Sequence, residues 1–250
     1  MVVDHLELIS LRVSSPVQIP GTTWSGSLGS RSISGGYEYA LILKTDGTLW
    51  GMGQNSTGYL AQGNAVQYSS PVQIPGTTWR SVSSYESHVI ATKTDGTLWA
   101  WGENGNGMLG QNNTTQYSSP KQIPGTNWGS NCAGGNAMSG CVKTDGTLWM
   151  WGRNHQGQTG TNSTSVDNYS SPIQVPGTTW SDIVQGAADA FSFGLKTDGT
   201  LWGWGSGGDG QIGYNTGAHR SSPVQIPGTN WSSAAIAGKT SFILETDNTP

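Results

Sequence analysis

Two glycine-rich stretches have the spacing of a nucleotide-binding loop. Gly105–Gly110 reads GNGMLG and Gly208–Gly213 reads GDGQIG, so both satisfy G-x-G-x-x-G. In a dinucleotide-binding fold this pattern opens a helix whose N-terminus holds a pyrophosphate. Here the following residues are QNNTTQYSSP and YNTGAHRSSP, and neither run has a helical pattern. We therefore interpret these glycines as turn residues and predict that the protein uses no cofactor.

The residue types that bind metals or act as nucleophiles are scattered along the chain. Its four histidines, His5, His88, His155 and His219, lie far apart, and Cys132 and Cys141 lack the paired C-x-x-C spacing of a zinc site. There is no G-x-S-x-G nucleophile elbow. We predict no catalytic residue, no metal site and no enzymatic activity. The two cysteines either pair across one hairpin or remain free.

Composition excludes several classes of protein. The 250 residues carry a formal net charge of −4, and only 10% of them are charged. This balance disfavours nucleic acid and anionic membranes as partners. No run approaches the length of a membrane span, and MVVDHLELIS lacks the basic and then apolar order of a signal peptide. We expect a soluble protein, and the sequence leaves its compartment and its oligomeric state open.

Two recurring phrases divide the chain into repeats. The phrase SSPVQIPGTTW, with few replacements, begins at Ser14, Ser69, Ser118, Ser170 and Ser221. The phrase KTDGTLW places its aspartate at Asp46, Asp95, Asp145, Asp198 and Asp247, in steps of 49, 50, 53 and 49 residues. We predict a single domain over residues 1–250. Its repeats span approximately 14–68, 69–117, 118–169, 170–220 and 221–250, the last completed by 1–13.

Each repeat has the pattern of four short strands. In the second copy these are Trp79–Ser84, His88–Thr94, Thr97–Gly102 and Ser118–Ile123. The Asp95–Gly96 pair is typical of a type I′ hairpin, in which both central residues have positive φ. Pro120 marks an edge strand. Four antiparallel strands in about 50 residues predict a β-propeller blade, with the chain's 12 tryptophans packed between blades and no helix.

The repeat resembles the regulator-of-chromosome-condensation repeat family, whose unit joins an apolar strand through Asp-Gly to an aromatic strand ending W-G-x-N-x-x-G-Q-L-G. The matching segments include TKTDGTLWAWGENGNGMLG (Thr92–Gly110) and LKTDGTLWGWGSGGDGQIG (Leu195–Gly213). The resemblance covers nearly the whole chain and implies an all-β propeller. The family usually closes seven blades, whereas this sequence supplies five. We predict a five-bladed ring closed by the N-terminal strand within Val2–Leu11, and the alternative is an open fragment of a seven-bladed ring.

Alternating strand directions give the propeller two faces with different sequences. One face carries the TDGT and IPGTTW turns, which are nearly identical in every copy, and the other carries turns that differ from copy to copy. Loops on a rigid scaffold concentrate binding residues, so we place the ligand on this variable face. Its outer loops include Gln54. The candidate ligand-binding residues are Tyr37, Glu38, Glu86, His88, Glu103, Asn136, Arg153, His155, Asp189, Phe191, Asp209 and Lys239.

Three functions fit this organisation. The leading hypothesis is a non-enzymatic binding or scaffold propeller that recognises a protein or a glycan through the variable loops. The resemblance implies a second, a guanine-nucleotide-exchange or chromatin-type regulator, but the chain starts Met1–Asp4 without a basic arm and shows no inserted wedge hairpin. The third is a multivalent lectin with one pocket per copy. Loop variation opposes a lectin on the variable face, and a pocket on the invariant face would escape that objection.

Overall fold

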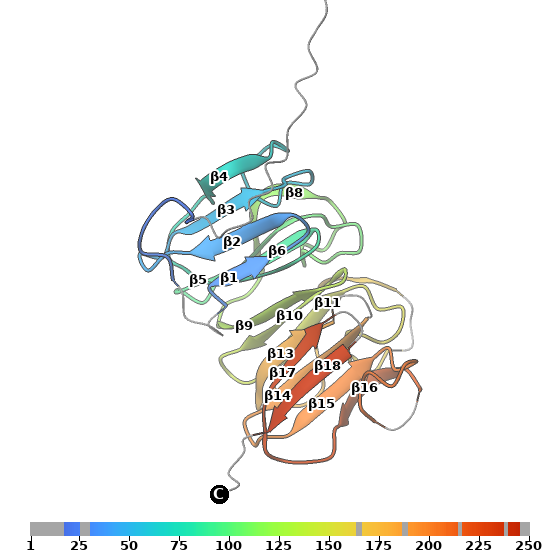
Figure 1. The fold of residues 1–250 in the computed structure, drawn as a ribbon. Coiled ribbons are helices and arrows are strands. Elements are labelled where there is room, and N and C mark those ends of the chain that lie inside the picture. Colours follow the sequence, from blue (N-terminus) through green and yellow to red (C-terminus); the bar gives the residue numbers. More distant parts are fainter. Residues whose placement is uncertain are drawn as a thin grey trace, which may run out of the picture.

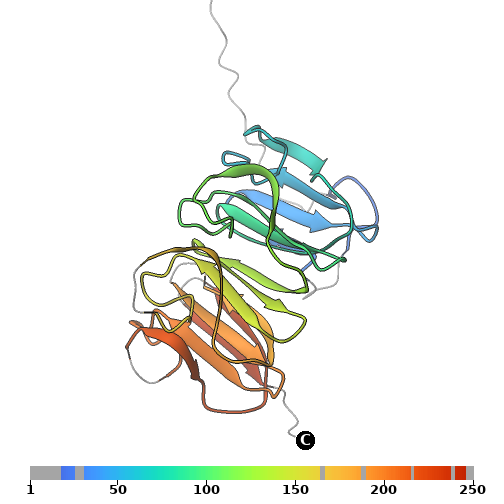
Figure 2. The ribbon, with the colours of Figure 1, turned by 180° about the vertical axis from the view of Figure 1, so that it is seen from behind.

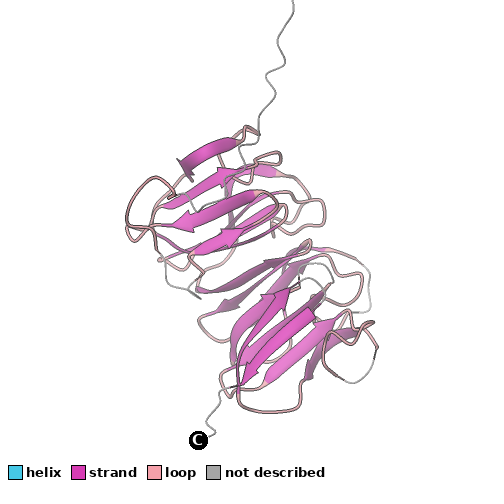
Figure 3. Cartoon of the chain, in the orientation of Figure 1, coloured by secondary structure: helices cyan, strands magenta, loops and turns pink. Residues whose placement is uncertain are grey.

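A computed structural model of the chain describes residues 18–25, 31–163, 167–186, 190–214, 217–237 and 240–245. Throughout these residues the regular structure consists of strands joined by turns and loops, without a helix (Figure 3). The predicted all-β class is therefore confirmed. Since no helix is present in this part of the chain, none is long and apolar enough to cross a membrane.

The strands are short, as expected from the frequent glycine and proline. In the first half of the chain they are β1 (Ile33–Gly35), β2 (Tyr39–Leu43), β3 (Leu49–Gly53), β4 (Tyr68–Gln73), β5 (Trp79–Tyr85), β6 (His88–Lys93), β7 (Leu98–Gly102) and β8 (Tyr117–Ile123). In the second half they are β9 (Trp128–Gly135), β10 (Met138–Lys143), β11 (Leu148–Gly152), β12 (Tyr169–Gln174), β13 (Trp180–Gln185), β14 (Phe191–Lys196), β15 (Leu201–Gly205), β16 (Arg220–Gln225), β17 (Trp231–Ala237) and β18 (Thr240–Glu245).

The strands form five antiparallel sheets, one per sequence repeat. Four sheets have four strands each, β1–β4 (blade 1), β5–β8 (blade 2), β9–β12 (blade 3) and β13–β16 (blade 4), and the fifth (blade 5) has β17 and β18. The first strands of successive blades contact one another, β1 with β5, β5 with β9, β9 with β13 and β13 with β17. Figures 1 and 2 show blades 1 and 2 in the upper half of the molecule and the later blades in the lower half.

The propeller architecture predicted from the repeat is thus present, and its count of blades agrees with five. The predicted closing strand, residues 1–13, lies outside the described residues. The segment that would follow β18, Thr246–Pro250, also lies outside them.

The KTDGTLW phrase forms the hairpin between the second and third strands of blades 1 to 4, but the turn differs from the predicted type I′ geometry. Gly96 has φ +79°, whereas Asp95 is not among the residues with positive φ. The Lys93 amide donates to Thr97 O at 3.0 Å, and the Asp95 carboxylate accepts from the Thr97 amide at 2.9 Å. A three-residue loop with one left-handed glycine therefore makes the turn, because the aspartate carboxylate replaces a second left-handed residue.

Six of the 12 tryptophans are buried, as predicted for packing between blades, whereas the other six, Trp24, Trp50, Trp99, Trp149, Trp202 and Trp231, are half-buried. Trp101, Trp151 and Trp204 are fully buried. Each indole N–H donates to a carbonyl in the long loop of the preceding blade, for example from Trp101 to Tyr59 O at 2.7 Å. The aromatic surface holds each blade against its neighbour, and the hydrogen bond fixes the angle of the ring.

The two cysteines lie on adjacent strands of blade 3. Cys132 in β9 and Cys141 in β10 are directly opposed in the register and are joined by a disulfide bond. Of the two alternatives left by the sequence, the structure has the pairing across one hairpin.

Candidate functional site

The strand register separates the two predicted faces. In blade 2, His88 pairs with Gly102 and Gly102 pairs with Tyr117, so the β5–β6 turn and the β7–β8 loop meet at one end of the sheet. At the other end Trp79 pairs with Lys93 and Leu98 pairs with Ile123. The variable loops of every four-stranded blade therefore gather on one face, and the repeated turns gather on the opposite face.

The long loops of the variable face are held by buried asparagines. In blade 2, Asn104 donates to Asn113 O at 2.9 Å and to Thr115 O at 2.9 Å, and its oxygen accepts from the Leu109 amide at 2.9 Å. Asn55 makes the equivalent bonds in blade 1. Each asparagine directly follows a residue that the sequence places on the variable face, Glu103 or Gln54. These loops are consequently rigid supports for the side chains at their tips.

Blade 1 has a hollow of about 430 Å³ on this face. Gln54 donates an amide hydrogen to the Glu38 carboxylate at 2.8 Å, which joins the β1–β2 turn to the β3–β4 loop. Two residues that directly precede lining residues in the chain have exposed apolar side chains, Tyr37 with 65% of its surface accessible and Val66 with 59%. The hollow is lined by Glu38, Gly53, Gln54, Gln67, Tyr68 and Ser69. Sequence reasoning missed Gln67, Tyr68 and Ser69, because Ser69 begins the repeated SSP phrase and the other two directly precede it.

A second hollow of about 230 Å³ lies between the loops of blades 3 and 4. It contains two exposed imidazoles, that of His155 from the β11–β12 loop and that of His219 from the β15–β16 loop. The Gly207 amide donates to His219 Nδ1 at 3.2 Å, which orients that ring. The pairing of the two histidines was not predicted, because their sequence positions are in different repeats and only the packing of blades brings them together.

Two predicted binding residues are buried, which removes them from the ligand-accessible surface. His88 is 1% exposed, and its Nε2 lies 2.9 Å from Ser139 Oγ in blade 3. Burial lowers the pKa of His88 to about 4, so the ring is neutral at pH 7. Phe191 is fully buried against Phe193, with ring centroids 5.8 Å apart. His88 begins β6 and Phe191 begins β14, the second strands of blades 2 and 4. The variability of the preceding turns did not indicate that these side chains face a neighbouring blade.

The other predicted residues lie on or near the variable face. Glu38, Glu86, His155 and Asp209 are exposed, and Glu103, Asn136 and Arg153 are half-buried. Tyr85 donates its hydroxyl hydrogen to the Glu86 carboxylate at 3.1 Å, and burial together with that carboxylate raises the pKa of Tyr85 to about 12. The predicted residues Asp189 and Lys239 lie outside the described residues. The structure joins Glu38 with Gln54 in one hollow and places His155 in another.

The described ranges contain no group of three or more histidine, cysteine, aspartate or glutamate side chains arranged to hold a metal ion. The glycine-rich stretch Gly105–Gly110 lies in the β7–β8 loop. Gly107 has φ +79°, and a Cβ there would lie 2.7 Å from Ser170 Cα of the next blade. These glycines therefore serve a left-handed turn and the close approach of two blades, as the turn interpretation predicted.

Fold and site together define a β-propeller of four-stranded blades that presents a rigid, chemically varied loop face. Profiles of the Regulator of chromosome condensation (RCC1) repeat match residues 95–142, 145–188 and 198–244. A second profile of the same repeat matches residues 31–58 and 79–107. The chain therefore belongs to the RCC1 repeat family. No curated protein sequence matches the chain significantly.

Solved structures share this fold at low sequence identity. Human WBSCR16 superposes with a TM-score of 0.76 at 20% identity, over 87% of this chain and 58% of WBSCR16. Prp20p from Saccharomyces cerevisiae superposes with a TM-score of 0.75 at 18% identity, over 86% of this chain and 56% of Prp20p. Yeast RCC1 (Prp20) in complex with Kap60 superposes with a TM-score of 0.73 at 18% identity, over 86% of this chain and 54% of Prp20. The chain thus spans somewhat more than half the length of these proteins.

Proposed function

We propose that this protein is a non-enzymatic binding propeller that recognises one protein partner through its variable face. The observation that carries the proposal is the difference between the hollows on that face. The blade 1 hollow has a carboxylate and side-chain amides, and exposed Tyr37 directly precedes its residue Glu38, whereas the hollow between blades 3 and 4 contains two imidazoles.

Unequal hollows on a rigid face favour a single, asymmetric partner over a repeating one. A protein surface offers different groups at different points, so it can match a carboxylate at one blade and imidazoles at another. Aromatic side chains near such polar groups are the usual anchors of protein interfaces, and Tyr37 is the most exposed large apolar side chain among the described residues.

The structural neighbours support a protein partner as well. Yeast RCC1 (Prp20) was solved bound to Kap60, and Prp20p was studied for its binding to Gsp1p and histones. A regulator of the exchange-factor or chromatin type is therefore the second candidate function. Binding to Gsp1p that accelerates nucleotide release would distinguish it from a scaffold.

Affinity capture with immobilised protein tests the proposal. Tyr37→Ala combined with His155→Ala removes two exposed side chains from the variable face, and Lys121→Ala removes an exposed side chain from the outer strand β8 as a control. We expect a protein captured by the wild type to be retained by the control and reduced at least tenfold by the double variant, as quantified by mass spectrometry. A set of captured proteins that is identical for all three baits would contradict the proposal.

Exchange activity is measured separately with Gsp1p loaded with fluorescent GDP. The proposal of a scaffold predicts the same rate of nucleotide release with and without the propeller. Acceleration of release would favour the exchange-factor alternative.

A further inference from the structure

Two equivalent pockets lie beside blades 3 and 4, where each blade meets the long loop and the linker of the preceding blade. They measure about 370 Å³ and 350 Å³. The first is lined by Gly110, Gln111, Asn112, Pro124, Gly125, Trp128, Lys143, Trp149, Ser171 and Pro172. The second is lined by Asn162, Pro176, Gly177, Trp180, Lys196, Trp202, Ser222 and Pro223, each of which matches a residue of the first by type and repeat position.

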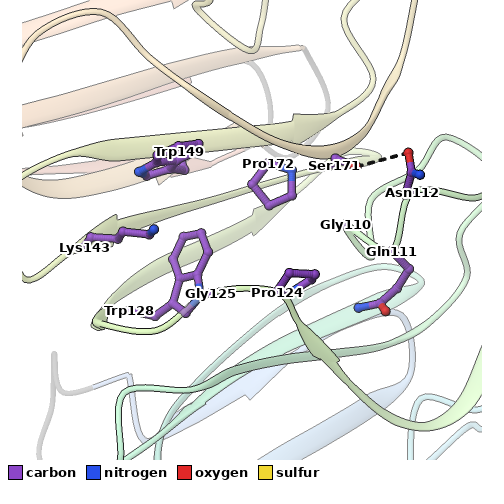
Figure 4. A pocket seen from close by; sticks show the side chains of 10 residues that line it. All are labelled: Gly110, Gln111, Asn112, Pro124, Gly125, Trp128, Lys143, Trp149, Ser171 and Pro172. Carbon is purple, nitrogen blue, oxygen red and sulfur yellow. Dashed lines mark hydrogen bonds between the residues drawn. The ribbon is translucent and has the colours of Figure 1, made fainter.

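A lysine lies between two tryptophan rings in each pocket. Lys143 Nζ is 4.6 Å from the ring centroids of both Trp128 and Trp149, and Figure 4 shows the three side chains together. Lys196 lies 4.8 Å and 4.5 Å from the equivalent rings. The rings attract the charge of each ammonium, but neither lysine has a hydrogen bond or an ion pair with any described residue. Three N–H donors are therefore available to a ligand.

The second tryptophan of each pocket is held in place by the TDGT turn. Trp149 Nε1 donates to Thr147 Oγ1 at 2.9 Å, and Thr147 Oγ1 donates to the Asp145 carboxylate at 2.6 Å. Trp202, Thr200 and Asp198 repeat this chain of hydrogen bonds. These bonds fix the ring before a ligand arrives, which reduces the entropy lost on binding.

An asparagine completes the rim of each pocket from the loop of the preceding blade. Ser171 donates its hydroxyl hydrogen to Asn112 Oδ1 at 3.3 Å (Figure 4), and Ser222 donates to Asn162 Oδ1 at 2.8 Å. The amide nitrogens of both asparagines have no hydrogen-bond acceptor among the described residues. Each pocket thus has an ammonium and an amide as free donors, with proline and tryptophan walls between them.

We propose that these two pockets bind carboxylate-bearing saccharide residues of the hexuronate type. The ligand carboxylate accepts charge-assisted hydrogen bonds from Lys143 or Lys196. Ring hydroxyls accept from the asparagine amide, and the apolar face of the sugar lies against tryptophan and proline. The volumes fall at the lower end of the range for small-ligand sites. This site goes beyond the proposed function, because its lining shares no residue with the two hollows of the variable face and it has a different class of ligand.

The equivalence of the pockets favours a saccharide over a protein. Two sites with the same side chains suit a ligand that presents the same group repeatedly, as a polysaccharide does. These two pockets thereby meet the requirement that the tips of the variable loops fail, namely the same polar groups in each copy. At blade 2 the corresponding residue types differ from the first pocket at two positions, since Gly63 replaces the rim asparagine and Ala61 replaces Gly110.

Native mass spectrometry of the purified chain with digalacturonate tests the proposal. Digalactose, which has hydroxymethyl groups in place of the carboxylates, is the matched neutral probe. We expect two digalacturonates per chain and at least tenfold weaker binding of digalactose. Absence of bound digalacturonate at millimolar concentration, or equal binding of both sugars, would overturn the proposal. Preferential binding of a proline-rich peptide would overturn it in favour of a peptide groove.

Lysine variants locate the sites. Lys143→Met and Lys196→Met keep an unbranched side chain that is one atom shorter and remove the charge, so each should leave one digalacturonate bound and the double variant none. Lys121→Met is the control, because Lys121 Nζ lies over Tyr117 and outside both pockets. Near-ultraviolet circular dichroism confirms that each variant is folded. Two sugars bound to the folded double variant would rule out these pockets.

A gain-of-site variant gives the sharpest test. Gly63 has φ +69°, close to the +56° of Asn112, and the nearest atom to a Cβ there is 3.8 Å away. Gly63→Asn can therefore adopt the existing backbone, and it should raise the number of bound digalacturonates from two to three. A count that remains at two would contradict the role of the rim asparagine. Because none of these substitutions is at a residue that lines the two hollows of the variable face, capture of a protein partner should be the same in all of these variants.

Discussion

His88 shows how a residue with a common functional chemistry serves packing instead. It lies at the interface of blades 2 and 3, and Ser139, its hydrogen-bond partner, donates in turn to Met108 O at 2.9 Å. Burial opposes protonation and lowers the pKa of His88 to about 4. The unfolded chain takes up a proton near pH 6.5, whereas the folded chain does not. Stability is therefore complete above that value and falls as the pH decreases toward 4.

Replacing His88 with glutamine should remove this pH dependence. The wild type should lose about 2 kcal/mol of unfolding free energy between pH 7.5 and pH 5 through His88. His88→Gln should lose correspondingly less over the same interval, although it starts from a lower value. Urea unfolding at the two pH values measures both losses. Parallel losses in the two proteins would show that His88 is protonated in the folded state.

The sequence indicated the position of each candidate residue in its repeat, but it did not indicate whether the side chain is exposed to solvent. His88 and Phe191 both follow variable turns, so their repeat positions indicated the ligand face, and both are buried. A side chain at the start of a strand points either to the next blade or to solvent. The choice depends on how closely the blades approach, which no local pattern contains. Tyr37 and Glu38 lie within the β1–β2 turn itself, and both are exposed.

At the level of elements, the glycines of the β7–β8 loop have different structural roles. Gly107 is left-handed and packs against the Ser170 backbone, whereas the Cβ of a residue at position 105 would meet only Glu103 Oε1 at 3.8 Å. Gly58 and Gly157 make the same close approach to Ser118 and Ser221. The motif that resembles a phosphate loop is therefore a contact between blades.

Two alanine variants distinguish these roles within one motif. Gly107→Ala places a Cβ in a left-handed position against neighbouring backbone and should lower the unfolding free energy by about 2–4 kcal/mol. Gly105→Ala should change it by about 0.5 kcal/mol or less. Thermal unfolding by calorimetry gives both values. Equal effects would refute the contact between blades as the reason for glycine at position 107.

The strands themselves were predicted closely because their signals are local. Alternation of Trp99 and Trp101, Pro120 on the outer strand and the Asp95–Gly96 turn each specify one element, and the four-stranded blade follows from their order. The turn type was wrong, because a carboxylate that accepts from the chain two residues ahead provides an alternative to a second left-handed residue. The paired pockets were not predicted, since each is formed by two blades and the linker between them.

At the scale of the whole molecule, one arginine joins blades that are distant in sequence. The guanidinium of Arg31, which precedes β1, donates to Asp182 Oδ1 and Cys132 O and to Ile183 O at 2.9 Å. Its own carbonyl accepts from the Val82 amide at 2.9 Å. Blades 1, 2, 3 and 4 therefore meet at a single residue near their first strands. The repeat pattern did not indicate this contact, because Arg31 has no counterpart with the same bonds in the other blades.

Removing this contact should weaken the attachment of the first blades to the later ones. The ion pair alone is worth about 1 kcal/mol or less, because the side chains of Arg31 and Asp182 are 21% and 38% exposed. The two carbonyl acceptors lose a charged donor as well, so we expect Arg31→Gln to lower the unfolding free energy by about 2 kcal/mol. Asp182→Asn should cost less, because the carbonyl bonds remain. A double-mutant cycle with urea unfolding gives the coupling energy. Zero coupling, with Arg31→Gln as stable as the wild type, would show that the blades hold together without this arginine.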